Sequence, residues 1–297
     1  MEKVRLSPVR HLCARRARPS RRGRLLNGRR AQGHCKMRLA GLAFVGLAAL
    51  SLLPNAFAQE ALPSIGVPYA RVKPSLTAEA SDPAWAEAAL ISQMQPPSNG
   101  IPATASTLEP PPRTTIRLLW DESFLYVRFL CEDREQYVAR EGRDEKLYEG
   151  DVVEVFLDPA GTAKDYFELQ VSPRNDLLDV RFGVDVEAKS EPNGVLAADI
   201  LSKHHRRDMG WNYQNVISAV RSVLPDKFWI VDIAIPASDI GLEKGFSPMA
   251  IRANFLRYDW QLVDGKRHLV PQNWSPDVFG RPHVSPQAMG FLQLEKP

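Results

Sequence analysis

The chain has little cysteine, and its placement excludes an internal cross-link. The 297 residues include only Cys13, Cys35 and Cys131. The first two lie in an N-terminal stretch that we expect to be removed, so the folded product keeps Cys131 alone. A lone cysteine cannot form an internal disulfide. The stability of the protein must therefore come from its core.

Sequence motifs of several enzyme classes are also missing. The chain has no Gly-rich phosphate loop, no Gly-x-Ser-x-Gly elbow and no Cys-x-x-Cys pair, which removes the usual signals of phosphate binding, hydrolase and thiol chemistry. His204 and His205 are adjacent and have no third ligand nearby in the sequence. Together with Arg206 and Arg207 they are interpreted as a solvated polar loop and not as a metal site.

Long apolar runs are rare, and the main one lies between Leu39 and Leu53. Lys36 and Arg38 flank its start, and Ala56-Phe57-Ala58 follows it with the small-x-small pattern of a signal peptidase site. The run is shorter than the ~20 residues that a membrane span needs, which disfavours a retained anchor. We expect residues 1–36 to be upstream overhang and residues 37–58 to be a cleaved signal peptide, giving a periplasmic or extracellular protein without a stable membrane span.

Removal of this leader reverses the charge of the chain. Residues 1–58 hold 13 of the 38 Lys and Arg but one of the 35 Asp and Glu, so residues 59–297 carry 25 basic and 34 acidic side chains, a net charge of −9. A protein that follows nucleic-acid phosphates needs a basic face. The acidic product therefore excludes a typical nucleic-acid binder and favours a neutral partner.

After Pro112, apolar residues recur at every second position between turn signals, the pattern of half-buried strands. Before that, Asp82-Pro83 predicts the cap and first position of a helical turn, with Trp85 turned inward. Trp120 and Trp229 also read as core residues. Nine strands are predicted, over 114–120, 124–131, 151–157, 166–171, 177–182, 216–223, 228–235, 250–257 and 291–294.

Long amphipathic helices do not alternate with these strands, which argues against an α/β enzyme fold. Half-polar alternation indicates antiparallel sheets that each expose one face. We therefore predict an all-β fold, an antiparallel two-sheet β-sandwich of jelly-roll type with few short helical turns. Residues 59–73 are taken as a lead-in segment and residues 74–297 as one domain.

Several segments in this order resemble the family 9 carbohydrate-binding modules of exported bacterial proteins, over about residues 74–294. They are residues 81–85 (SDPAW), 119–127 (LWDESFLYV), 150–159 (GDVVEVFLDP), 166–171 (YFELQV), 233–236 (IAIP), 252–257 (RANFLR), 274–276 (WSP) and 289–291 (MGF). The resemblance implies a sandwich that binds poly- or oligosaccharide without cutting it, often beside a glycoside hydrolase in carbohydrate catabolism.

The family grips a sugar between two aromatic residues, whose counterparts here are Tyr148 and Trp274. Tyr148 stands where a tryptophan is more usual, and it could instead be an ordinary loop residue. Trp274 could equally be a structural plug beneath its loop. Alternation along the strand places Asp151 and Glu154 on opposite faces. Glu154 lies among core-sized residues, so it either bonds a sugar hydroxyl or pairs with an arginine such as Arg128 or Arg181.

Four further charged or polar positions complete the predicted site and its alternatives. Arg252 and Asn254 share one face of their strand, where they could offer donors to sugar hydroxyls, and Arg257 on the other face is also taken as a binding candidate. Arg174 lies about where the family has a sugar-binding arginine, or else belongs to a plain turn with Asn175 at its corner.

Three further possibilities are a structural calcium ion, glycoside hydrolysis and a bound haem. Asp158 and Asp165 are weak candidates for the structural calcium that the family sometimes carries, although their spacing is not that of a known calcium loop. A glycoside hydrolase would need a pair of carboxylates, and no pair stands out. Related sandwiches also hold b-type haem. The available ligands, which show no pattern, are Met209, Met249, Met289, His268 and His283.

Overall fold

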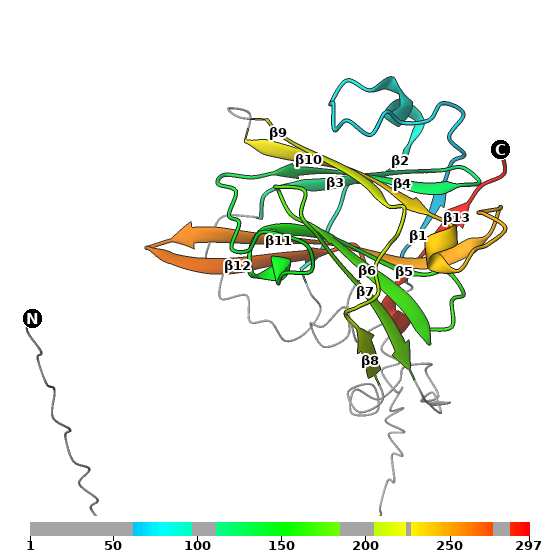
Figure 1. Cartoon of the computed structure of the whole chain (residues 1–297). Coiled ribbons are helices and arrows are strands. Elements are labelled where there is room, and N and C mark those ends of the chain that lie inside the picture. The colour runs from blue at the N-terminus through cyan, green and yellow to red at the C-terminus, as the bar shows by residue number, and fades with distance from the viewer. Residues whose placement is uncertain (1–61, 97–110, 185–204, 224–226, 276–285) are drawn as a thin grey trace, which may run out of the picture. The chain divides into compact units, whose positions relative to one another are not determined.

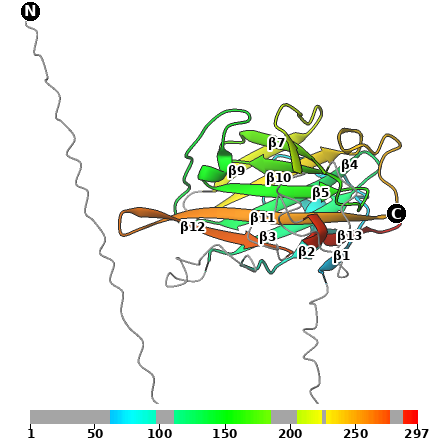
Figure 2. The same cartoon turned by 90° about the horizontal axis from the view of Figure 1, so that it is seen from below.

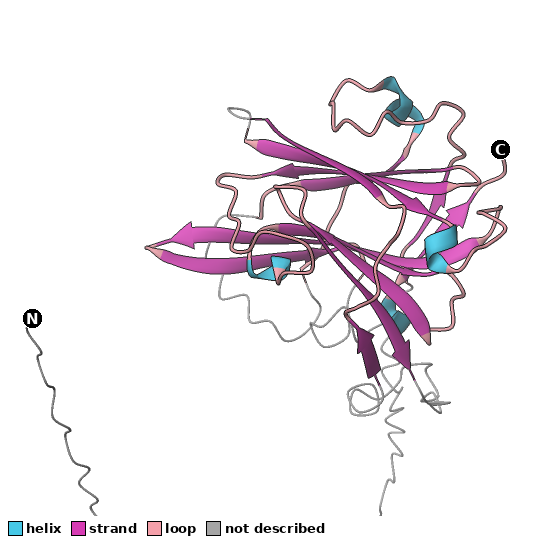
Figure 3. Ribbon diagram, in the orientation of Figure 1, coloured by secondary structure: helices cyan, strands magenta, loops and turns pink. Residues whose placement is uncertain are grey.

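The computed structural model describes residues 62–96, 111–184, 205–223, 227–275 and 286–297. These residues form two β-sheets that face each other in two layers (Figures 1 and 2). Among the described residues the only helical segments are isolated 3-10 turns (Figure 3). The all-β sandwich predicted from the sequence is confirmed.

The larger sheet has eight strands in the order β1-β13-β11-β5-β6-β7-β8, with β12 paired to β11. The smaller sheet has five strands in the order β2-β3-β4-β10-β9. The strands of the larger sheet are β1 (Ser64–Val67), β5 (Val152–Asp158), β6 (Asp165–Val171), β7 (Leu177–Val184), β8 (His205–Asp208), β11 (Ala250–Val263), β12 (Lys266–Asn273) and β13 (Gly290–Leu294). Those of the smaller sheet are β2 (Ala89–Ile91), β3 (Thr114–Trp120), β4 (Phe124–Glu132), β9 (Ile217–Val223) and β10 (Phe228–Pro236).

All nine predicted strands are present, and four more were missed. β2 has only three residues and β12 contains Pro271, so neither shows a clear period of two. β1 lies inside the supposed lead-in and pairs in parallel with β13, which makes that segment part of the sandwich. β8 covers His205–Asp208 and pairs with β7, so the interpretation of this stretch as a loop is wrong.

The main core lies between the two sheets and is built from the alternate positions of their strands. Trp120 and Trp229 belong to it and are at most 1% exposed. Cys131 is buried in the same layer, and burial raises the pKa of its thiol to about 12. The thiol therefore stays protonated at neutral pH, as expected of a structural cysteine.

The turn η1 (Pro83–Glu87) packs on the outer face of the smaller sheet. The Asp82 carboxylate accepts a hydrogen bond from the backbone N–H of Ala84, and Pro83 opens the turn. Trp85 is 2% exposed and lies over that face with Leu119 and Tyr126. The capped turn and the inward tryptophan are confirmed.

A buried ion cluster closes one end of the layer between the sheets. Arg257 is 1% exposed, and its Nη2 donates to Asp133 at 2.7 Å and to Asp259 at 3.1 Å. The guanidinium carbon lies 4.8 Å from the centre of the Trp229 ring. Asp151 completes the cluster of three buried aspartates. One arginine thus ties β11 of the larger sheet to the end of β4 in the smaller one.

No helix within the described ranges is long and apolar enough to cross a membrane.

Replacement of Arg257 by methionine tests this cluster. Loss of the cation leaves the buried carboxylates without a positive charge beside them, which typically costs about 3–5 kcal/mol. We expect Arg257→Met to lower the free energy of unfolding by that amount in urea titrations followed by tryptophan fluorescence.

Arg221→Met is the matched control, because Arg221 pairs with Glu79 at a site where both side chains are about half exposed. Exposed pairs contribute about 0–1 kcal/mol. Equal unfolding midpoints for the two variants would contradict the role given to Arg257.

Candidate functional site

A cavity of about 230 Å³ opens on the outer face of the larger sheet. Its lining is unusual for a sheet face because it combines aromatic rings with buried acids. The lining residues are Tyr148, Glu154, Phe156, Glu168, Gln170, Arg207 and Tyr258. They come from five separate elements, so only the folded sheet brings them together.

Two tyrosines and the buried Phe156 form the aromatic part of this cavity. Tyr148 belongs to the turn η2 (Leu147–Glu149) and is 37% exposed. Tyr258 is half-buried on β11, where it stands opposite Val152 of β5. Flat aromatic side chains that remain accessible beside polar groups are what binding of a partly apolar, partly polar ligand requires.

The position of Tyr148 is fixed through its neighbours. The Trp260 indole donates from Nε1 to the Tyr148 carbonyl at 3.1 Å, and the Asp151 carboxylate accepts from the backbone N–H of Trp260 at 2.7 Å and of Tyr137 at 2.5 Å. Gly150 lies so close to the 137–139 segment that a Cβ there would come within 2.7 Å of backbone atoms. These contacts hold η2 against the end of β5 and β11.

The floor of the cavity carries two carboxyl groups and one amide. Glu154 of β5 stands opposite Gln170 of β6, and Glu168 stands opposite Phe156, so the two glutamates are diagonal neighbours on one face. The Gln170 amide donates from Nε2 to Glu168 Oε1 at 2.5 Å. Its Oε1 is buried and has no hydrogen-bond partner in the described structure. All three side chains are at most 5% exposed.

Burial shifts both glutamates toward the protonated form. Removal from water raises the pKa of Glu168 to about 7, against the lowering effects of the Gln170 bond and of Arg207. Burial also raises the pKa of Glu154 well above its usual range, and the neighbouring Glu168 raises it further. Two neighbouring buried acids do not both ionise easily, because each charge opposes the other.

Arg207 of β8 is the basic residue among those that line the cavity. Its guanidinium carbon lies 5.7 Å from the centre of the Phe182 ring. The supposed polar loop thus supplies a strand that brings a cation toward Glu168.

Tyr148 and Glu154 are the two predicted residues that line this cavity. No salt bridge joins Glu154 to an arginine in the described structure. The two arginines considered for it have other partners, Arg128 with Asp232 at 2.6 Å and Arg181 with Asp165 at 2.7 Å.

Trp274 does not face Tyr148. It is 7% exposed in the core between the sheets, with its ring centre 5.7 Å from that of Phe255. A Cβ on Gly290 would come within 2.8 Å of its ring. The interpretation of Trp274 as a structural plug fits this position, and Tyr258 lines the cavity together with Tyr148.

The remaining predicted residues do not line the cavity either. Asn254 is 4% exposed and uses its amide on the backbone of Ser275, as donor at 3.1 Å and acceptor at 2.9 Å. Arg257 lies on the inner face of β11 in the ion cluster, because alternation sends it toward the core. Arg174 is exposed in its turn and pairs with Glu141, while Asn175 takes the left-handed corner with φ of 65°.

Asp158 and Asp165 do not fit a calcium ion. The buried Asp158 carboxylate accepts from the backbone N–H groups of Thr162 and Ala163, and Asp165 is held in two hydrogen bonds by Arg181. Calcium needs six to eight free oxygen ligands. The three buried aspartates near Arg257 do not fit one either, since the guanidinium bonds two of them.

The haem candidates lie apart in the fold. Met289 is buried in the outer cluster of the larger sheet, whereas Met209 is 42% exposed beyond β8. His268 lies on β12, and His283 falls outside the described residues. Met209, Met289 and His268, which the structure describes, thus lie on separate elements of the sandwich.

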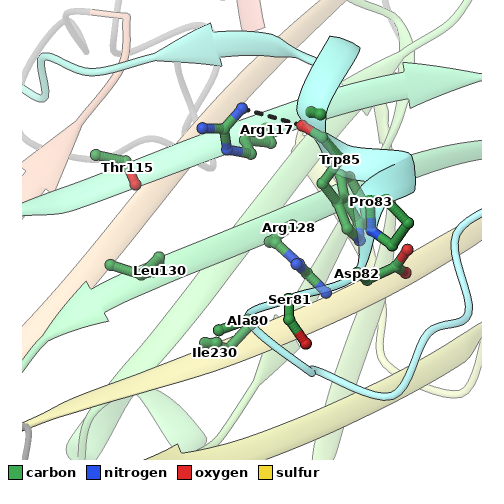
Figure 4. A pocket seen from close by; sticks show the side chains of 11 residues that line it. Ala80, Ser81, Asp82, Pro83, Trp85, Thr115, Arg117, Arg128, Leu130 and Ile230 are labelled. Carbon is green, nitrogen blue, oxygen red and sulfur yellow. Dashed lines mark hydrogen bonds between the residues drawn. The ribbon is translucent and has the colours of Figure 1, made fainter.

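A second cavity, of about 390 Å³, lies on the outer face of the smaller sheet beneath η1 (Figure 4). Its one aromatic residue is Trp85, which is 2% exposed, with the Arg128 guanidinium 4.7 Å from the ring centre. Arg128 itself donates twice to Asp232. This larger hollow therefore offers no accessible aromatic surface, and the smaller cavity fits carbohydrate recognition better.

Residues 78–213 match the family model described as carbohydrate family 9 binding domain-like. This part of the chain is therefore similar to the family 9 carbohydrate-binding domains. The matched range contains Tyr148, Glu154, Glu168 and Arg207, whereas Tyr258 lies beyond it on β11.

Among solved structures, a candidate carbohydrate-binding protein from Bacteroides uniformis has the same fold, with 16% identity, a TM-score of 0.54 and coverage of 79% of this chain and 100% of that one. Two structures of a family 9 carbohydrate-binding module from Caldicellulosiruptor kristjanssonii, one with cellotriose and one with glucose, have 19% identity and TM-scores of 0.48. Each covers 79% of this chain, and this chain covers 95% and 97% of theirs. No curated protein matches the chain in sequence.

The residues of the cavity that sequence reasoning missed carried a usable signal. Glu168 and Gln170 alternate with the core residues of β6, as Glu154 does on β5. Two acids on the polar phase of adjacent strands would have suggested a shared face. The alternation of apolar and polar residues does not show that β5 and β6 are neighbours in the sheet.

Glu168→Gln tests the buried acid. In the unfolded chain the acid ionises near pH 4.5, but burial in the folded domain raises the pKa of Glu168 to about 7, so the unfolded state loses its proton first. The wild type therefore loses stability as pH rises from about 4.5 to about 7. We expect Glu168→Gln to remove this loss and gain on the order of 3 kcal/mol over the wild type at pH 8, but little at pH 4.

Urea unfolding at both pH values measures the effect. Glu149→Gln serves as the control, because this glutamate is exposed and pairs with Arg140. A stability difference between wild type and Glu168→Gln that stays constant with pH would contradict the assignment.

Proposed function

We propose that the protein binds carbohydrate without cleaving it, in the cavity between Tyr148 and Tyr258. The single observation that carries the proposal is that two accessible tyrosines line a hollow whose floor holds carboxyl and amide groups. A sugar ring offers C–H surface to aromatic faces and hydroxyls to such polar groups. The family 9 match over residues 78–213 supports the same conclusion.

The choice of this face also has electrostatic support. The other large hollow has its tryptophan covered and its arginine paired, so ligand entry there would need rearrangement of a buried ion pair. The tyrosine-lined cavity needs none, since the glutamates, the amide and Arg207 already stand at its surface. Recognition groups on a rigid sheet lose little conformational freedom when a ligand binds.

Alanine at Tyr148 or at Tyr258 is expected to weaken carbohydrate binding about tenfold each, because burial of a large apolar side chain contributes about 1.5–3 kcal/mol. The measurement is a glycan array on residues 59–297, followed by calorimetric titration with the best ligand.

Arg174→Ala is the control, since Arg174 is exposed outside the cavity and should keep wild-type affinity. Binding that is lost in Arg174→Ala and retained in both tyrosine variants would move the site elsewhere on the domain.

A glycoside hydrolase is the second candidate, because Glu154 and Glu168 form a close acid pair with raised pKa values. Hydrolysis needs two carboxyl groups that flank the glycosidic bond. Both glutamates rise from one floor, so they would approach a sugar from the same side. We expect no release of reducing sugar from any ligand that binds, and release that disappears in Glu154→Gln would favour the hydrolase.

We further propose that the protein is exported and serves carbohydrate catabolism beside separate glycoside hydrolases. The support is the leader over residues 37–58 and the acidic net charge of the remainder. A domain that binds sugar without cleaving it contributes to catabolism by bringing the sugar to separate enzymes.

Export has a direct test. Expressed with its leader in a Gram-negative host, the protein is expected to appear in the periplasm with Gln59 as its first residue, as read by intact mass. Ala56→Arg and Ala58→Arg together should block processing, because signal peptidase needs small residues there. An unprocessed wild-type protein in the cytoplasm would contradict the proposal.

A further inference from the structure

The floor of the tyrosine-lined cavity has an excess of negative charge. Glu154 from β5 and Glu168 from β6 face it, and Arg207 from β8 is the basic residue in its lining. The other titratable lining groups are Tyr148 from η2 and Tyr258 from β11. When both acids ionise, one negative charge is left without a partner.

Charged groups beyond the lining are already engaged. On the same face of the sheet, Asp158 is held by the backbone of its own turn, and the Tyr166 hydroxyl lies 2.6 Å from His205 Nε2. Arg252 donates to the carbonyl of Gln287 at 2.9 Å. β7, which lies between β6 and β8, contributes apolar residues to this face, namely Leu178, Val180 and Phe182.

The hydrogen-bonding groups on the floor favour a cationic ligand, as the charge of the floor does. Because Gln170 donates to a carboxylate oxygen, its Nε2 faces Glu168 and its Oε1 is left as an unpaired acceptor in a side chain that is 3% exposed. The two carboxylates and this carbonyl are all acceptors. A buried acceptor without a donor is costly, on the order of 1–3 kcal/mol. The complement of such a floor is a cation with several N–H donors.

We propose that the ligand presents an ammonium group to Glu154 and Glu168, which makes it an oligosaccharide of free amino sugars. This inference rests on the carbohydrate-binding function proposed above and specifies its ligand class. An ammonium group has three donors and one positive charge, which matches three acceptors and one uncompensated negative charge. The tyrosines then contact the C–H surface of the same sugar ring.

Binding of this ligand is coupled to a proton. Without ligand, the pair of acids keeps a proton near neutral pH, because burial and mutual repulsion oppose double ionisation. The ammonium group replaces that proton as the positive charge, and the proton leaves to solvent. Affinity therefore rises with pH from about 5 to 7 and falls again when the ammonium group itself loses its proton.

A metal ion is a poorer complement. The described residues offer two acids and one amide oxygen on a single floor, whereas calcium takes six to eight oxygen ligands around it. Calcium chloride is therefore expected not to compete with the sugar.

The test compares three trisaccharides of matched size by calorimetry on residues 59–297 at pH 6.5, built from glucosamine, from N-acetylglucosamine and from glucose. We expect glucosamine trisaccharide to bind at least tenfold more tightly than the other two. Titration in two buffers of different ionisation heat should show proton release for glucosamine trisaccharide alone.

Two variants assign the effect to the floor. Glu168→Gln should abolish proton release and reduce affinity for the glucosamine ligand at least tenfold more than it reduces affinity for the neutral sugars. Arg207→Met removes the competing cation and should strengthen the glucosamine ligand. The pH-dependent unfolding of Glu168→Gln shows separately that the variant folds.

The outcomes separate this inference from the proposed function. Tyr148-dependent binding of the neutral trisaccharides with no preference for glucosamine would overturn the amino-sugar inference and keep the carbohydrate function. Competition by calcium chloride, or a glucosamine preference that survives Glu168→Gln, would also overturn it. Binding of no saccharide would overturn both.

Discussion

The structure depends on the buried charge of Arg257. Its guanidinium bonds Asp133 and Asp259 inside the layer between the sheets and lies over Trp229. A charge in that position is tolerated only because it is matched. Asp151, in the same cluster, accepts from the backbone of Tyr137 and Trp260. The network therefore joins the two sheets and the turn that carries Tyr148, so core stability and site geometry share one set of contacts.

The opposite face of the larger sheet shows the converse arrangement, in which buried charge is not matched. Glu154 and Glu168 lie within a hydrophobic outer cluster and share one arginine. The pair of acids avoids this unmatched charge by retaining a proton in the folded state. Because the same acids ionise in the unfolded chain, retention of the proton lowers the stability of the fold at neutral pH. A sheet face that carries such a cost without a structural benefit is best explained by a ligand that uses the acids. The proposed amino-sugar specificity follows from this imbalance.

The two outer faces also differ in what covers them. On the smaller sheet, η1 places Trp85 over the strands, and the Arg128–Asp232 pair completes a closed polar contact. On the larger sheet the cavity stays open between η2 and β8. The same sandwich thus has one face whose tryptophan is covered and one face whose tyrosines remain accessible, and the size of each hollow does not reflect this difference.

The sequence by itself determined the local features: nine strands, the capped turn with its inward Trp85, the core tryptophans, and the placement of Asp151 and Glu154 on opposite faces. Each depends on a period of two or on a cap within a few residues. It also proposed Tyr148 and Glu154 as site residues, and both line the same cavity. Only the tertiary structure decided the rest of the cavity, because Glu168, Arg207 and Tyr258 meet through strand order. It likewise placed Trp274 and Arg257 in the interior, since burial depends on what the opposite sheet supplies.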